Sequence, residues 1–233
     1  MSQCCKFRFS DLLFEQYLFS QGLDTFEYEK NWEGIPTHPD YTVSRNNELY
    51  IFDVKEFEAQ PFPSGTFAVE PYGRIREKIN AAYTQFKYFK DKPCCLVLYT
   101  HDPFVRLREP AVVLAAMYGD LGFTTLYNTQ TGSAVPGSTK RAFLKDGKMF
   151  RYESRRAQNQ TFSALITLRY VYGGQQKHLG VIVWENDFAR IEFPHDMFCG
   201  PYDERWGQNG DVITRIFAGE GVLTLEEFSK SES

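Results

Sequence analysis

Two β-rich runs separated by a short turn are the feature that most restricts the fold of this chain. Residues 40–43 and 49–57 are rich in β-branched and aromatic side chains, and an Asn-Asn pair stands between them at 46–47. Asparagine tolerates the positive φ angles of a tight hairpin turn, so the pattern predicts an antiparallel hairpin. A turn centred on this pair places Asp40 opposite Asp53.

The predicted register gathers charged side chains on one face of the hairpin. Side chains alternate along a strand, so Asp53 and Lys55 share a face while Val54 points to the other. Two carboxylates as close as Asp40 and Asp53 repel each other unless a cation lies between them, and oxygen ligands suit Mg²⁺ or Mn²⁺. A bound cation lowers the pKa of a coordinated water, which Lys55 can orient or help to deprotonate. This set suits phosphodiester hydrolysis.

The residues Pro39-Asp40, a gap of twelve residues and then Asp53-Val54-Lys55 resemble the motif of the PD-(D/E)xK superfamily, also called restriction endonuclease-like. The resemblance implies a metal-dependent nuclease in which Asp40 and Asp53 bind the metal. It further implies that Lys55 positions the attacking water and that the backbone carbonyl of Val54 is another ligand. The alternative without chemistry is a surface pair of Asp53 with Lys55 and a turn role for Asp40.

A short helix predicted at residues 10–22 carries a fourth candidate, Glu15. A Ser-Asp start, apolar positions at helical spacing and a terminal glycine mark this helix. In the superfamily that the motif resembles, a helix before the first strand commonly supplies an acidic residue to the metal site. The resemblance therefore implies that Glu15 is a further catalytic and metal-binding residue, although an exposed helical charge also explains its position.

A second helix, predicted at residues 72–89, carries candidates for contact with phosphate. The resemblance implies that a polar residue of this helix points toward the phosphate, and Lys78 and Gln85 lie seven residues apart on one face. We rank Gln85 before Lys78. Arg74 would extend a basic stripe, and a solvated helix face is the alternative for Lys78 and Gln85.

Residues 139–156 are the best candidate for holding a nucleic acid backbone. They contain seven Lys and Arg residues against two acidic ones. Clustered cations bind phosphates, so we select Lys140 and Arg141 as possible DNA contacts. A solvated hairpin around Asp146-Gly147 with ordinary surface charges explains the same segment.

The order of the predicted elements indicates an α/β fold. A helix at 10–22, strands at 25–30, 40–43 and 49–57, a helix at 72–89 and a buried strand at 94–99 follow one another. This order resembles the core of the superfamily, which is a helix, a three-stranded antiparallel meander, a second helix and a further strand. We therefore predict a restriction endonuclease-like nuclease core over residues 1–125, with a mixed central sheet flanked by helices.

Residues 126–233 are predicted to form a β-rich C-terminal extension on the same sheet. Two β-rich runs at 162–172 and 179–191 surround a Gly-Gly turn. Before them, Pro110 opens a helix expected to end at residue 118. Residues 127–141 are rich in Thr, Gly, Ser and Pro, which favours a flexible loop over the site.

Composition narrows the setting of the protein. The net charge of -4 argues against a surface coated with nucleic acid but is compatible with one basic groove. No apolar run is long enough to span a membrane and the N-terminus lacks a signal-peptide core, so we expect a cytoplasmic protein without membrane contact. Five cysteines without metal-ligand spacing indicate reduced thiols.

These observations predict a Mg²⁺-dependent deoxyribonuclease that acts in restriction, phage defence or DNA repair. Its partners would be DNA and either a second copy of the chain or a larger DNA-processing complex. Endonuclease and exonuclease action both fit, and no base-reading motif predicts a target sequence. Two alternatives stay open: a catalytically inactive DNA-binding or scaffold subunit of the same fold, and a protein-interaction module with no nucleic-acid role.

Overall fold

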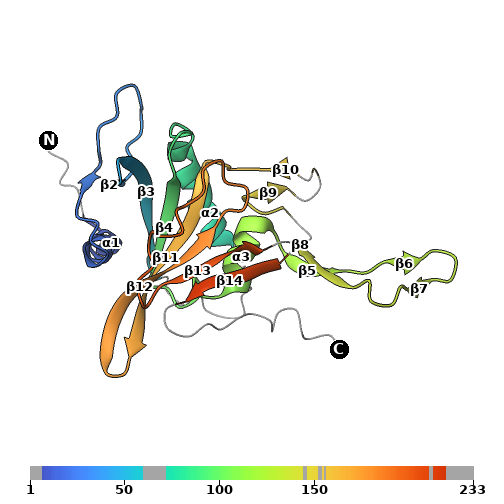
Figure 1. Cartoon of the computed structure of the whole chain (residues 1–233). Helices are drawn as coiled ribbons and strands as arrows, with labels where there is room; N and C mark the ends of the chain where they lie inside the picture. The colour runs from blue at the N-terminus through green and yellow to red at the C-terminus, as the bar shows by residue number, and fades with distance from the viewer. Residues whose placement is uncertain are drawn as a thin grey trace.

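An eight-stranded mixed sheet forms the centre of the protein (Figure 1). The computed structural model describes residues 7–59, 72–143, 146–151, 154, 156–209 and 212–218. The strands follow the order β1-β2-β3-β4-β11-β12-β13-β14 across the sheet. The described residues form three helices, so the α/β class predicted from the sequence is confirmed.

The first half of the chain has the predicted order of elements. It consists of α1 (Phe9–Ser20), β1 (Phe26–Tyr28), β2 (Tyr41–Arg45), β3 (Glu48–Phe57), α2 (Gly73–Phe86) and β4 (Cys94–Thr100). Strands β1, β2 and β3 form an antiparallel meander, and β4 lies parallel to β3. A parallel neighbour requires a crossover connection, which α2 supplies.

The hairpin of β2 and β3 has the register expected from its turn. Asn46 and Asn47 have φ angles of 52° and 64°, as a two-residue turn of this type requires. The ladder runs from Arg45 opposite Glu48 to Tyr41 opposite Phe52. Continued by one residue, this register places residue 40 opposite residue 53, so the predicted alignment is confirmed.

The later part of the chain completes the sheet. It contributes α3 (Pro110–Tyr118), β11 (Phe162–Gly173), β12 (Gln176–Glu185), β13 (Glu204–Asn209) and β14 (Val212–Ala218). Strand β11 runs parallel to β4, and β12 pairs with β11 in an antiparallel hairpin. The prediction that this β-rich segment packs on the same sheet is confirmed.

Residues 127–141 do not form the predicted loop over the site. Strands β5 (Leu121–Thr124) and β8 (Lys140–Phe143) pair with each other, and beyond them β6 (Tyr127–Asn128) pairs with β7 (Ser133–Ala134). These pairs form an arm on the side of the view opposite α1 (Figure 1). The loop prediction was wrong because turn-forming residues here connect short paired strands. A further ladder joins β9 (Phe150–Arg151) to β10 (Arg156–Ala157), so the described part of 139–156 is not one hairpin around Asp146-Gly147.

Two hydrophobic clusters fill the two faces of the sheet. One contains residues of α2 and α3 with Ile51, Leu96 and Leu98, and the other contains residues of α1 with Phe52 and Val54. The alternation of β3 side chains between these clusters shows that both faces of this strand are covered. Side chains at odd positions of β3 therefore point toward α2, and those at even positions toward α1.

The predictions about cysteines and membrane helices can be compared with the structure only for the described residues. Cys94 and Cys95 are buried free thiols of β4, and Cys199 is an exposed free thiol. Cys4 and Cys5 lie outside the described residues. None of the helices in the described ranges has the length and apolar character needed to cross a membrane.

Candidate active site

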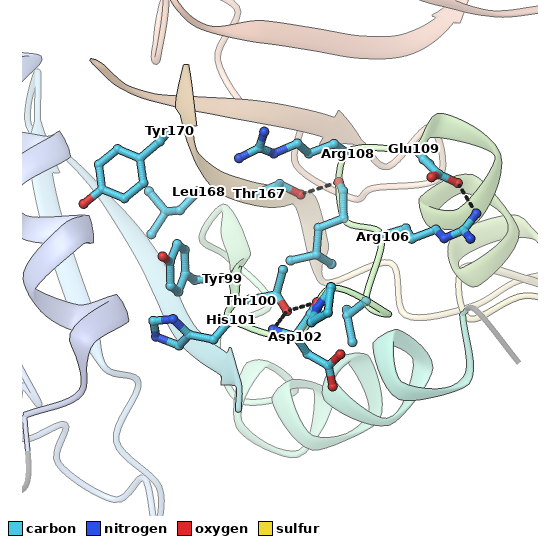
Figure 2. Close-up of a pocket in the computed structure, with 13 residues that line it drawn as sticks. Tyr99, Thr100, His101, Asp102, Arg106, Arg108, Glu109, Thr167, Leu168 and Tyr170 are labelled. Atoms are coloured by element: carbon cyan, nitrogen blue, oxygen red, sulfur yellow. Dashed lines mark hydrogen bonds and ion pairs between the residues drawn. The ribbon is translucent and has the colours of Figure 1, made fainter. Parts of the chain in front are cut away.

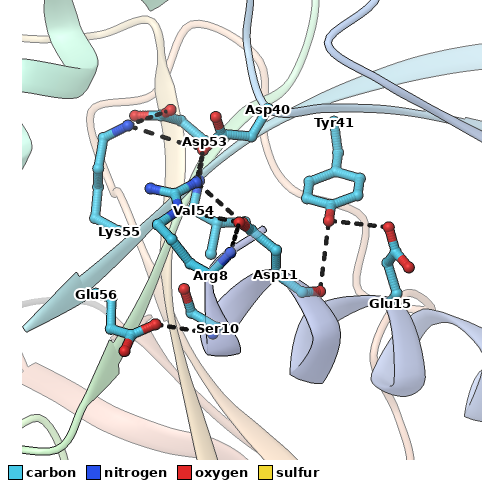
Figure 3. Close-up of polar contacts among 10 residues, drawn as sticks. All are labelled: Arg8, Ser10, Asp11, Glu15, Asp40, Tyr41, Asp53, Val54, Lys55 and Glu56. Atoms are coloured by element: carbon cyan, nitrogen blue, oxygen red, sulfur yellow. Dashed lines mark hydrogen bonds and ion pairs between the residues drawn. The ribbon is translucent and has the colours of Figure 1, made fainter. Parts of the chain in front are cut away.

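Asp40, Asp53 and Lys55 lie together where the ladder between β2 and β3 ends (Figure 3). The Lys55 Nζ atom is 2.6 Å from Asp53 Oδ1 and 3.8 Å from Asp40 Oδ2. The structure thus brings together the three residues that the sequence motif singled out. Their side chains occupy the α2 face of β3, since Asp53 and Lys55 share the odd-numbered face with Ile51.

Asp40 takes the place of a strand partner for the backbone of β3. Strand β2 begins at Tyr41, and beyond it the amide of Val54 donates a 2.7 Å hydrogen bond to Asp40 Oδ2. The N–H and C=O groups of one residue in an extended strand point to the same side. The carbonyl of Val54 is therefore directed to the side where the Asp40 carboxylate lies, as a ligand role for that carbonyl requires.

Asp53 is a buried carboxylate that is incompletely satisfied. Its side chain is 0% exposed, and among the described residues its Oδ2 atom has no hydrogen-bond partner. Burial raises the pKa of Asp53 to about 7, the Lys55 ammonium opposes this rise, and the Asp40 carboxylate adds to it. A buried acceptor without a donor costs about 1–3 kcal/mol, so this position favours binding of a cation.

Arg8 connects the site to the start of α1. Its Nη2 atom lies 2.8 Å from Asp40 Oδ2 and 2.9 Å from Asp11 Oδ1. Burial alone would lower the pKa of the Arg8 guanidinium, but Asp11 and Asp40 outweigh burial and raise it. Arg8 and Asp11 were not selected from the sequence. Their spacing of three residues at a helix start was the available signal, because this spacing allows the two side chains to meet.

The structure does not bring Glu15 into this cluster. The Tyr41 hydroxyl donates a 3.1 Å hydrogen bond to Glu15 Oε1, and no contact between Glu15 and Asp40 or Asp53 is recorded among the described residues. Helix α1 covers the face of β3 that bears Phe52, opposite the face of Asp53. The acidic residue of α1 nearest the site through its contacts is Asp11, one turn before Glu15. The metal role predicted for Glu15 therefore stays a prediction, and the recorded contacts of Glu15 do not reach the other candidate residues.

The candidates on α2 differ in how they relate to the site. Burial lowers the pKa of Lys78, and the positive charges of Lys55, Arg74 and Arg8 lower it further. Lys78 therefore lies in the same electrostatic environment as Lys55. Arg74 is ion-paired with Asp102 and donates to the Glu58 carbonyl.

Gln85 is less well placed than Lys78. Its Oε1 atom is buried and lacks a hydrogen-bond partner within the described ranges, and no recorded contact links it to Asp53 or Lys55. The ranking of these two side chains for phosphate contact stays a prediction, and the surroundings of Lys78 are the more cationic. For Lys140 and Arg141, the structure describes the backbone in β8, and both side chains lie outside the described residues.

The donor set fits a magnesium ion. No group of three or more His, Cys, Asp or Glu residues suited to a metal occurs within the described ranges. Mg²⁺ is usually held by one or two carboxylates and keeps several waters, so Asp40, Asp53 and the Val54 carbonyl meet its ordinary requirement. The unpartnered Oδ2 atom of Asp53 is the observation that supports the fit. A cation here would compete with Arg8 for Asp40 and with Lys55 for Asp53.

Comparisons of this chain with protein-family models, with curated proteins and with solved structures found no match in any of the three.

Proposed function

We propose that this protein is a Mg²⁺-dependent nuclease that hydrolyses phosphodiester bonds in DNA. One observation carries the proposal: the carboxylates of Asp40 and Asp53 lie beside the Lys55 amine, and among the described residues the buried Oδ2 atom of Asp53 has no hydrogen-bond donor. Structural ion pairs normally satisfy their buried oxygens, because an unpaired one is costly. A site that keeps this cost is suited to binding a cation.

The residues divide the chemistry between them. Asp40 and Asp53 would hold Mg²⁺ or Mn²⁺ together with the Val54 carbonyl. When bound, the metal supplies a water of lowered pKa and neutralises charge on the phosphate. Lys55, as the ammonium paired with Asp53, would orient that water, and the proton that the water loses would pass to the surrounding solvent. The water oxygen then bonds to phosphorus, the bond from phosphorus to the leaving sugar oxygen breaks, and the leaving oxygen takes up a proton.

The cations around the site favour an anionic substrate. The positive charges of Arg8, Lys55 and Arg74 lie close enough to Lys78 to lower its pKa. Arg8, Lys55 and Arg74 are ion-paired with Asp40, Asp53 and Asp102, and for Lys78 no ion pair is found among the described residues. A phosphate would pair with Lys78, and Lys78 and Arg8 would position it beside Asp53. The basic segment with Lys140 and Arg141 would extend this contact along the DNA.

The arrangement of elements supports the finer fold assignment. The order α1, β1, β2, β3, α2, β4 and the antiparallel meander correspond to the helix, meander, helix and strand of a restriction endonuclease-like core. Residues 1–125 would form that core of the PD-(D/E)xK type, and residues 126–233 would extend its sheet. By analogy, the protein would act in restriction, phage defence or DNA repair in the cytoplasm. It would act alone, as a homodimer or in a larger complex.

The test is cleavage of plasmid and linear DNA with Mg²⁺, Mn²⁺ or a chelator. We expect metal-dependent cleavage by the native chain and its loss in Asp53→Asn and Lys55→Ala. Glu48→Gln serves as the matched control, because Glu48 is an exposed acid at the turn end of the same strand. Absence of cleavage by the folded protein with every metal would contradict the proposal.

A second candidate is an inactive DNA-binding or scaffold subunit of the same fold. The contact of Arg8 with Asp40 favours it, because a guanidinium there neutralises a metal ligand. Such a protein would bind DNA equally well with metal or chelator. A folded chain that neither cleaves nor binds DNA would instead be a protein-interaction module.

A further inference from the structure

A pocket of about 360 Å³ opens at the carboxyl end of β4 (Figure 2). Strand β11 runs parallel to β4 and extends beyond it, so residues of both strands line the pocket. In open α/β sheets, ligands commonly bind in crevices outside the carboxyl ends of parallel strands. Neither the motif nor the metal site uses this pocket.

One side of the pocket presents aromatic surface. The rings of Tyr99 and His101 lie 4.9 Å apart between centroids, and Phe9 of α1 packs at 5.6 Å and 5.4 Å from them. Tyr170 stands beside this cluster in Figure 2, and Lys177 Nζ lies 3.4 Å from its ring centroid. Nucleic acid bases stack on such rings, and a cation near the ring binds the phosphates of the same strand.

The other side of the pocket presents a cation. Its two acidic residues are already paired, Asp102 with Arg74 and Glu109 with Arg106. For Arg108, no hydrogen bond or ion pair is recorded among the described residues, and Figure 2 shows its guanidinium directed toward Tyr170.

Electrostatics place Arg108 near the phenol groups. Burial raises the pKa of Tyr99. The charges of Tyr170 and Glu56 raise this pKa further, and the positive charge of Arg108 lowers it. Arg108 and both tyrosines line this one pocket. An apolar ring surface together with a guanidinium that has no ion pair among the described residues suits a flat base that carries a phosphate.

The pocket lies next to the proposed catalytic centre, at the carboxyl ends of the neighbouring strands β3 and β4. In the register of β3 and β4, Lys55 pairs with Leu98 and the following residue, Glu56, pairs with Tyr99. Glu56 also holds His101 at 2.9 Å between Oε1 and Nε2. Lys55 points to the α2 face and Tyr99 packs with the α1 cluster, so a substrate touching both must bend around the carboxyl ends of β3 and β4.

This bend selects against a duplex. Double-stranded DNA resists bending over distances of about 150 base pairs, whereas an unpaired strand turns freely between neighbouring nucleotides. We propose that the pocket binds an unpaired nucleotide of the DNA strand to be cut, with its base on Tyr99 and Tyr170 and its phosphate on Arg108. The inference rests on the proposed function, because it identifies the substrate of that site as DNA with single-stranded character.

Binding can be measured without cleavage. A labelled oligothymidylate of about eight nucleotides, within the span of small single-strand sites, is titrated with the protein in chelator and followed by fluorescence anisotropy. We expect tighter binding of this strand than of a labelled GC-rich DNA hairpin, whose stem stays double-stranded during the titration. Arg108→Ala and Tyr170→Ala should each weaken single-strand binding about tenfold, the loss expected for one phosphate or stacking contact.

Arg190→Ala is the matched control. Arg190 is an exposed arginine whose backbone amide contacts Gln160, before the amino end of β11 and away from the pocket. Its substitution should leave the affinity unchanged. Arg108 is also exposed, so its variant should fold, and circular dichroism spectra confirm this for every variant.

The inference is overturned if neither strand form binds, if duplex binds as tightly as the single strand, or if both pocket variants bind like the native chain. Cleavage assays on the same samples separate it from the proposed function. Duplex cleavage that is equally fast in the native chain and the pocket variants would keep the nuclease and reject the pocket. Pocket-dependent binding without cleavage under any metal would keep the pocket and reject the nuclease.

Discussion

Asp53 and Asp203 are both buried carboxylates, but their surroundings differ. Asp203 accepts hydrogen bonds at both oxygens: Oδ2 from the Tyr17 hydroxyl at 2.6 Å and the Gly200 amide at 2.7 Å, and Oδ1 from the Val181 amide at 2.9 Å. Asp53 has Lys55 on Oδ1, and among the described residues no donor on Oδ2.

The difference separates a structural acid from a candidate functional one. Asp203 ties α1, β12 and the loop before β13 together, and its satisfied oxygens stabilise those contacts. Asp53 has an oxygen without a donor among the described residues, at a cost to stability, which supports the proposed cation site.

The largest effect is expected on activity. Asp53→Asn should reduce metal-dependent DNA cleavage about a thousandfold or more, because a neutral amide neither binds the metal well nor balances Lys55. Its melting temperature in chelator should not fall, since the substitution removes a buried charge. Initial cleavage rates and thermal melts of the same preparation measure both quantities. A variant that cleaves normally would remove Asp53 from the catalytic centre.

The next effect is on stability and concerns the other acid. Asp203→Ala should lower the free energy of unfolding by about 3 kcal/mol, because two buried donors and one part-buried donor lose their acceptor. Urea denaturation followed by tryptophan fluorescence measures it. The exposed acid Asp196 provides the control, and Asp196→Ala should denature like the native chain. Similar midpoints for the Asp203 and Asp196 variants would contradict the structural role of Asp203.

The third prediction uses the raised pKa of Asp53. The folded-state pKa of about 7 lies above the ordinary aspartate value of about 3.9, so the folded protein holds this proton more tightly than the unfolded chain. The proton that Asp53 holds stabilises the folded state fully below the pKa of the unfolded chain. This stabilisation is lost as pH rises through the folded-state pKa of about 7. In chelator, the native chain should therefore lose about 1–3 kcal/mol relative to Asp53→Asn between about pH 4 and 7. Parallel denaturation curves at all pH values would contradict this.

The smallest effect concerns Arg8. Since its guanidinium competes for Asp40, Arg8→Gln should tighten Mg²⁺ binding about fivefold, as expected for release of a partly exposed ion pair. Isothermal titration with MgCl₂ measures the affinity. Arg45→Gln is a control, because Arg45 makes a comparable pair with Asp196 at the other end of β2. Weaker metal binding in Arg8→Gln would mean that Arg8 supports the site.

The hairpin could be predicted because its information is local. Two asparagines with positive φ fix the turn, and the turn fixes which residues of β2 and β3 are opposite. The meeting of Asp40, Asp53 and Lys55 follows from that register. The elements up to β4 were predictable for a similar reason, since each has its own periodicity and its own breakers.

Contacts between elements could not be predicted in this way. The phase of α1 against the sheet decides whether Asp11 or Glu15 approaches Asp40, and one turn of helix separates the two choices. Lys78 and Gln85 lie on one helix face, but only packing shows which of them reaches Lys55. The arm was not predicted because its short strands contain the same residue types as loops.

The position of β11 has a consequence for how the chain folds during synthesis. Strand β11 pairs with β4 across an intervening segment that contains α3 and the arm, so β4 has an unpaired edge until residues near 168 have emerged. An apolar, unpaired parallel strand is slow to find its partner and prone to aggregate meanwhile. A fragment ending at residue 125 would therefore retain the proposed catalytic residues and expose that edge. Expression of the proposed core would depend on the strands that follow it.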